Sequence, residues 1–301
     1  FMINKLIAST IPILPKWFIR FFSGPYVAGE TIEDALTHVK KINNSGFAAT
    51  IDILGEHTME IKTASSIASD YCELYKKIDQ KSLDCNLSIK PSHLGLDISL
   101  DTAKKNFERI INNAEKYSNF LRFDMESSSH TNDTLKIYDH CLKKYSKVGV
   151  VLQAYLKRSI SDLERLAKPG FNARICKGIY KESPSIAYQN PEEIRNNFLK
   201  MAEIMIFKKA YSCYATHDQG LIDRILDLIK KHKLGIDKFE FQVLYGVPMN
   251  GRLEELIENG YKVRVYVPFG PDWYDYSLRR LKENPDIASY VIKNIFSKNS
   301  Y

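Results

Sequence analysis

Short apolar runs alternate with longer helical patterns along most of this chain, and this alternation constrains the fold more than any other feature. Each run is rich in β-branched residues, and the runs start roughly every 31 residues, near the length of one strand–helix unit. Eight runs occur, at residues 47–54, 86–90, 120–125, 149–155, 172–180, 211–217, 239–245 and 262–268.

Runs that are apolar along their whole length predict strands buried on both faces, and parallel strands need helical connections. Helical patterns fill the gaps, for example at residues 102–117, 134–145, 191–209 and 221–232. We therefore expect an α/β fold, a closed (β/α)₈ TIM-like barrel. An open doubly wound sheet is the competing fold, but it usually has fewer strands. Its nucleotide-binding version needs a GxGxxG turn after the first strand, whereas Gly55-Glu56-His57 stands there.

Residues 1–45 are expected to form an N-terminal helical arm, and residues 46–301 one barrel domain with C-terminal helices, because no Pro-, Gly- or Ser-rich linker divides the chain. The first apolar stretch is interrupted by Pro12 and Pro15, which disfavours a signal peptide. It predicts either a packed helix or a basic, aromatic segment that seeks a membrane surface. Residues 287–296 predict another amphipathic helix.

The chain of 301 residues carries 43 basic and 36 acidic residues, a net charge of +7 that suits an anionic ligand or an anionic lipid surface. Acidic residues are interspersed with the basic ones, which disfavours an RNA-binding scaffold, so no nucleic-acid partner is expected. The five cysteines form no CxxC pair and stand in mostly apolar surroundings. We therefore expect buried thiols in a reducing compartment, which predicts a cytoplasmic protein. Peripheral attachment to the inner face of a membrane is an open alternative.

Polar groups occur at the ends of the predicted strands, where barrel enzymes carry their chemistry. One such residue is usually an exposed loop residue, but a charge inside an apolar run is costly without a partner. Lys90, Asp124 and Arg174 are the clearest of these, and the predicted mouth is more cationic than anionic. The strand-end residues are Glu56, His57, Lys90, Asp124, Gln153, Arg174, Lys177, Thr216, His217, Gln242, Tyr245, Arg264 and Tyr266.

A catalytic metal is the alternative use of such a mouth, in a metal-dependent barrel hydrolase. Asp124, His57 and His217 could meet in space, but the chain has no HxH pair and no HExxH helix. A GxSxG nucleophile is also absent. We expect no metal.

The segment after the eighth run predicts a further helix, opened by Asp272 as its N-cap. Tyr276, Arg279 and Arg280 share part of one face of this helix. Over the barrel mouth, the two guanidinium groups would suit a carboxylate or phosphate. On an outer helix they would be a solvated pair, and spacing alone does not decide between the two.

Several of these stretches together resemble the flavin-dependent proline dehydrogenases of the monofunctional bacterial type. The resemblance covers residues 24–284, and its motifs occur in order at strand–helix positions. They are FAATIDILGE (47–56), LRFDME (121–126), ARICKGIY (173–180), YATHD (214–218), EFQVLYG (240–246) and RVYVPFG…YSLRRLKEN (264–284).

The resemblance implies a barrel that holds FAD non-covalently at its mouth, with the last helix above the flavin. Hydride would pass from C5 of L-proline to flavin N5 and yield Δ¹-pyrroline-5-carboxylate. Asp124, Arg174 and Tyr266 are the implied catalytic residues, with Arg174 near N5. Substrate contacts are implied for Lys90, Tyr180, Leu244, Tyr276, Arg279 and Arg280, and Tyr266 also packs against the ring. Flavin contacts are implied for Met125, Gln153, Cys176, Lys177, Gly178, Thr216 and His217.

Three positions depart from the family pattern: Ile179 replaces a small residue, Asp218 an asparagine and Lys181 a tryptophan. They are expected to change the tuning of the flavin and the affinity of the site. Tyr276 favours proline over 4-hydroxyproline because related hydroxyproline enzymes tend to carry a smaller residue there. The resemblance further suggests a membrane quinone as electron acceptor and a pyrroline-5-carboxylate dehydrogenase as partner.

Overall fold

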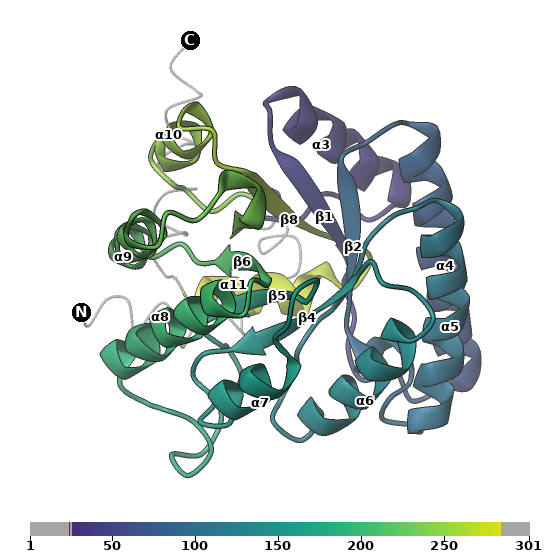
Figure 1. Cartoon of the computed structure of the whole chain (residues 1–301). Coiled ribbons are helices and arrows are strands. Elements are labelled where there is room, and N and C mark those ends of the chain that lie inside the picture. The colour runs from purple at the N-terminus through teal and green to yellow at the C-terminus, as the bar shows by residue number, and fades with distance from the viewer. Residues whose placement is uncertain (1–23, 25, 284–301) are drawn as a thin grey trace.

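Eight parallel strands close into a barrel in this computed structural model, which describes residues 24 and 26–283, with side chains up to Leu278 (Figure 1). Each strand pairs with its neighbours in sequence, and β1 pairs with β8 to close the ring. The strands are β1 (Ala48–Ile53), β2 (Cys85–Ile89), β3 (Leu121–Phe123), β4 (Val148–Gln153), β5 (Asn172–Cys176), β6 (Tyr211–Ala215), β7 (Phe239–Leu244) and β8 (Val263–Phe269).

Helices lie outside the ring of strands in Figure 1. They are α3 (Ile32–Asn44), α4 (Ile61–Gln80), α5 (Leu100–Lys116), α6 (Thr131–Leu142), α7 (Ser159–Leu166), α8 (Pro191–Phe207), α9 (Gln219–Lys231) and α10 (Arg252–Glu258). The chain also forms α11 (Trp273–Glu283), which is not part of this outer layer, and 3₁₀ turns at Pro91–Leu94 and Ile236–Lys238. The predicted (β/α)₈ barrel is therefore confirmed. Most predicted runs extend too far, and the run at 172–180 stops at Cys176 because the chain turns at Gly178, whose φ is 105°.

Side-chain caps fix where several helices begin. Ser99 accepts a hydrogen bond from the backbone N–H of Thr102 at the start of α5, and Asp218 accepts one from Leu221 at the start of α9. Each cap satisfies a backbone donor that the first helical turn leaves without a partner. Both helices therefore start at a defined residue just beyond the barrel mouth.

The described part of the predicted N-terminal arm includes α3, which packs against β1 and β8 through Ala35, Leu36 and Val39. The rest of the arm, residues 1–23 and 25, and the helix predicted at 287–296 lie outside the described residues. The domain division at residue 45 therefore stays a prediction. Within the described part, no helix combines the length and the apolar character that a membrane span needs.

The core lies between the strands and the surrounding helices. Phe107 of α5 stacks against Phe123 of β3 with ring centroids 4.6 Å apart, and Tyr138 of α6 meets Phe123 edge-on. These interlocked rings fix the helices against the barrel wall. The wall in turn holds the ends of the strands in a fixed order around the mouth.

Helix α11 begins directly after Asp272 and lies across the barrel in Figure 1. Its residue Tyr276 is buried and lines the cavity at the C-terminal ends of the strands. The expectation of a final helix over the mouth is confirmed. Arg279 and Arg280 belong to this helix, but their side chains lie outside the described residues.

Candidate active site

A cavity of about 1110 Å³ opens at the C-terminal ends of the strands, under α11. All the site residues that the resemblance implies, up to Tyr276, line it, although they come from most of the strands and from α11. They are Lys90, Asp124, Met125, Gln153, Arg174, Cys176, Lys177, Gly178, Tyr180, Thr216, His217, Leu244, Tyr266 and Tyr276. The barrel topology alone brings them together, because every strand points the same way.

Asp124 is the centre of the polar groups on the cavity floor. One of its carboxylate oxygens accepts from the Ser88 hydroxyl and, at 2.8 Å, from Nη1 of Arg174. The other oxygen accepts from the Tyr266 hydroxyl at 2.9 Å. Burial alone would raise the pKa of Asp124, but Arg174 and Lys90 outweigh it and lower this pKa. Asp124 is thus a fixed negative charge.

Lys90 is held by Asp52, with 2.5 Å between Nζ and Oδ2. Burial raises the pKa of Asp52 to about 6, against the opposing effect of Lys90. Burial would lower the pKa of Lys90, but Asp52 and Asp124 outweigh it and raise this pKa. Lys90 therefore stays cationic at neutral pH while most of its side chain is buried, as an anion-binding group requires.

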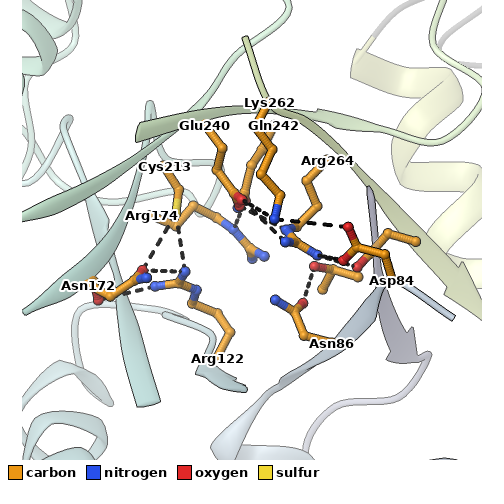
Figure 2. Close-up of polar contacts among 12 residues, drawn as sticks. Asp84, Asn86, Arg122, Asn172, Arg174, Cys213, Glu240, Gln242, Lys262 and Arg264 are labelled. Atoms are coloured by element: carbon orange, nitrogen blue, oxygen red, sulfur yellow. Dashed lines mark hydrogen bonds and ion pairs between the residues drawn. The ribbon is translucent and has the colours of Figure 1, made fainter. Parts of the chain in front are cut away.

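Arg174 is fixed from a second side by a chain of contacts that runs down the inside of the barrel. Its Nε donates to Gln242, Gln242 donates to Glu240, and Glu240 pairs with Arg264 (Figure 2). The guanidinium also lies over the Tyr266 ring, 5.1 Å from the centroid. These contacts hold Arg174 in one orientation beside Asp124.

A second set of charges lies on the side of the mouth formed by β5 and β6. Lys177 donates to Asp218 at 2.5 Å, and Arg195 donates to the same oxygen at 2.7 Å. Burial would raise the pKa of Asp218, but the bonds from Lys177 and Arg195 lower it to about 2. The negative charge of Asp218, which stands where the family pattern has an asparagine, is therefore neutralised by two cations.

Neutral donors and acceptors complete this side. Gln153 donates to the backbone carbonyl of Glu126 at 2.8 Å, which fixes the orientation of its amide. His217 accepts from the backbone N–H of Leu244 through Nε2 at 2.9 Å, so that nitrogen carries no proton. The two side chains thus present defined hydrogen-bonding groups at the cavity.

The backbone at Gly178 lies so close to the Tyr155 ring that a side chain has no room there. A Cβ atom built there would lie 2.0 Å from Cδ1 of Tyr155, and the φ of 105° disfavours any residue with a side chain. Ile179, the bulky departure that follows, is 47% exposed. It also lines the cavity, so the departure changes the lining.

Arg264 does not lie at the mouth, and its assignment to the strand-end residues is wrong. It is the second residue of β8, so it lies near the opposite, N-terminal end of the barrel. There it pairs with Glu240 (Figure 2). It also donates to the backbone carbonyl of Ala49. Arg122 is buried at the same end and donates to Asn172. Both are packing and pairing residues.

The three residues weighed as metal ligands have separate partners. Asp124 contacts Ser88, Arg174 and Tyr266, and Nε2 of His217 is engaged by a backbone N–H. His57 contacts Asp97 instead, with 2.9 Å between Nδ1 and Oδ2. The described geometry therefore gives no support to a catalytic metal formed by these three.

Asp52 and Glu240 are site-supporting residues that sequence reasoning missed. Both are acids inside apolar strands, where a charge needs a buried partner. Asp52 stands in Ile51-Asp52-Ile53, and Glu240 between Phe239 and Phe241. The same signal that marked Lys90 and Asp124 could have found them.

Comparisons with known proteins agree with this geometry. The proline dehydrogenase family model matches residues 35–293. Proline dehydrogenase 1 of Bacillus subtilis (strain 168) is 37% identical over 91% of this chain and 90% of that protein. The proline dehydrogenase of Deinococcus radiodurans is 33% identical over 90% of this chain and 88% of that protein.

A solved structure of proline utilization A (PutA) from Bdellovibrio bacteriovorus, inactivated by N-propargylglycine, has the same fold with a TM-score of 0.81. It is 24% identical, and the match covers 87% of this chain and 32% of that much longer one. The closed barrel, the side chains at its mouth and the relatives matched over about 90% of their length all indicate the same family. The chain belongs to the proline dehydrogenase family and is an oxidoreductase of that class.

Proposed function

We propose that this enzyme oxidises L-proline to Δ¹-pyrroline-5-carboxylate with a non-covalently held FAD. The observation that carries the proposal is the cavity of about 1110 Å³ with Lys90 and Arg174 on its floor and Tyr276 in its roof. Pockets for single drug-sized ligands measure roughly 300–1000 Å³, so this one has room for a dinucleotide and a small substrate. Its cations suit both the pyrophosphate and a carboxylate.

The residues of the β4–β6 side fit the flavin. Gln153 and His217 supply oriented polar groups, Lys177 supplies a cation, and Gly178 lines the same cavity. Met125, Cys176 and Thr216 complete the proposed contacts and line the same cavity. When bound, the flavin would accept the hydride from proline C5 at its N5.

The substrate carboxylate is proposed to bind Lys90 together with Arg279 and Arg280 of α11. Asp52 holds Lys90 charged and in place. Tyr180, Leu244 and Tyr276 would pack around the pyrrolidine ring, as lining residues of the cavity. Positioning the ring and neutralising its carboxylate are the main tasks left to the protein, because the cofactor carries the chemistry.

Asp124 and Arg174 are proposed to act at the reacting face. Arg174 would stabilise negative charge on the reduced cofactor, since its guanidinium is permanently charged and is oriented by Asp124 and Gln242. Tyr266 keeps its proton, because burial and the nearby Asp124 raise its pKa well above the usual value. It therefore acts as a hydrogen-bond donor that fixes Asp124. The substrate amine must lose its own proton before the C5–H bond breaks.

Proline is the proposed substrate, rather than 4-hydroxyproline. Tyr276 is buried at the cavity roof, where an extra hydroxyl on the ring would need space. A membrane quinone is proposed as the electron acceptor and a pyrroline-5-carboxylate dehydrogenase as the consumer of the product. Peripheral attachment to a membrane surface would bring the quinone within reach.

The test is anaerobic reduction of the purified protein. It is expected to be yellow with one FAD per chain, released on denaturation, and L-proline is expected to bleach the flavin band. At equal concentration, 4-hydroxyproline is expected to bleach it far more slowly. A protein that stays colourless after incubation with FAD would refute the proposal, and so would a bound flavin that L-proline leaves oxidised.

A further inference from the structure

A group of three metal-ligating side chains lies at the rim of the mouth. His57 follows β1, Asp97 precedes α5, and His130 directly precedes α6, so three successive connections contribute one residue each. Both imidazoles meet one carboxylate: His57 Nδ1 is 2.9 Å from Oδ2 of Asp97, and His130 Nε2 is 2.7 Å from Oδ1. The three ligand atoms lie within 4.8 Å of one another.

We propose that His57, Asp97 and His130 bind one divalent transition-metal ion, with Zn²⁺ as the preferred ion. Two imidazoles and one carboxylate are a ligand set that suits Zn²⁺ rather than Mg²⁺ or Ca²⁺, which prefer oxygen ligands. In a tetrahedral site with bonds of about 2.1 Å, ligand atoms are about 3.4 Å apart. The two N···O distances of 2.9 and 2.7 Å would lengthen by about 0.5 and 0.7 Å to reach this spacing, and all three ligand atoms already lie within 4.8 Å of one another.

Surrounding contacts orient the His130 imidazole and fix the backbone at His57. The hydroxyl of Ser127 lies 3.0 Å from Nδ1 of His130, so it can accept a hydrogen bond from the protonated Nδ1 and leave Nε2 free to ligate. His57 has a left-handed φ of 56°, and its backbone N–H donates to the Ser92 hydroxyl at 3.1 Å. Ser92 is in turn held by the buried Glu126. The ligands are thus positioned by the fold.

The exposure of the three residues leaves a coordination position open. The side chain of His57 is 57% exposed, whereas those of Asp97 and His130 are 19% and 17% exposed. Three protein ligands with solvent on one side fit an ion whose fourth ligand is water. The ion would tie the connections that lead into α4, α5 and α6, which are neighbours in Figure 1.

This site is separate from the proposed chemistry. His57 reaches the cavity edge, but Asp97 and His130 do not line the cavity. The ion is therefore assigned a stabilising role at the rim, and the inference does not depend on the proposed reaction. Proline oxidation is not needed to test it.

The experiment is a calorimetric titration of the tag-free, purified protein with ZnCl₂ at pH 8. The wild type is expected to bind one ion, and His57→Asn and His130→Asn are each expected to weaken binding at least tenfold. His140→Asn is the matched control, because His140 forms a similar pair with Glu108, 2.6 Å apart, on the protein surface. Its affinity for zinc is expected to equal that of the wild type.

Thermal unfolding gives the second measurement. Zinc is expected to raise the unfolding temperature of the wild type and of His140→Asn, because an ion that binds only the folded state stabilises it. It should leave that of His130→Asn unchanged, and each metal-free variant serves as its own reference. A wild type that binds no zinc, or a His130→Asn variant that binds it as tightly as the wild type, would overturn the proposal.

Discussion

Glu240→Gln is expected to destabilise the barrel by about 3 kcal/mol, because it leaves the charge of Arg264 buried without its main partner. Glu240 is 3% exposed and accepts from Nε of Arg264 at 2.8 Å and from Nη2 at 3.3 Å. Arg264 is itself 5% exposed and remains charged. Glutamine keeps the shape and one acceptor oxygen of the side chain but removes its charge.

The magnitude follows from two arguments. Removing one partner of a buried ion pair costs about 3–5 kcal/mol, and Asp84, 3.8 Å from Arg264, offsets part of that loss. The pKa of Glu240 gives a similar figure. Burial would raise it, but Arg264 lowers it from 4.5 to about 2, which stabilises the charged form by about 3 kcal/mol. That is a large part of the 5–15 kcal/mol typical of a folded protein.

Urea unfolding of the wild type and Glu240→Gln measures the effect. Glu192→Gln is the matched control, because Glu192 pairs with Arg224 on the surface, 2.7 Å away, where a pair contributes less than about 1 kcal/mol. The contribution of Glu240 is present above pH 4.5 and is lost as the pH falls from there toward 2. The two variants should therefore differ at pH 7 and converge in acid. Equal unfolding midpoints at pH 7 would refute the reasoning.

Two further substitutions test the roles of residues at the barrel mouth. Asp124→Asn removes the charge that orients Arg174, so kcat for proline should fall about 100-fold or more, and the unfolding temperature should fall as well because the buried Arg174 loses its charged partner; activity within a few-fold of wild type would contradict the assigned role. Gly178→Ala should cost at least about 2 kcal/mol in urea unfolding, because it combines a φ of 105° with overlap onto Tyr155. Gly170→Ala is the control for the backbone effect alone, because Gly170 has a φ of 87° and no atom within 4 Å of the added Cβ. Equal losses of unfolding free energy in the two variants would contradict the role of the Tyr155 overlap.

The barrel could be predicted from the sequence because its signal is local. Each strand buried on both faces gives a continuous apolar run, as in Val148–Gln153, and each helix gives its own periodicity. The residue at which each strand ends could not be predicted in this way, because a turn such as the one at Gly178 is set by backbone geometry and not by the apolar character of the run. The run at 172–180 therefore extends beyond the strand, which ends at Cys176.

Partners across the barrel could not be predicted in the same way. Asp52 meets Lys90 and Glu240 meets Arg264 only because neighbouring strands pair in a particular register. Arg264 lies at the opposite end because it is the second residue of β8, and apolar character alone does not show at which end of a run a charge stands. His57 meets Asp97 because two connections fold toward each other, and no strand pattern encodes that contact.

The most direct measurement of the central claim is an anaerobic proline titration of the flavin in the wild type, Arg279→Met and Arg280→Met. The account predicts that all three proteins keep FAD and that both variants need at least about 100-fold more proline for half reduction, because each loses one charged contact to the carboxylate. Variants reduced at the same proline concentration as the wild type would contradict it, and so would variants that lose their flavin.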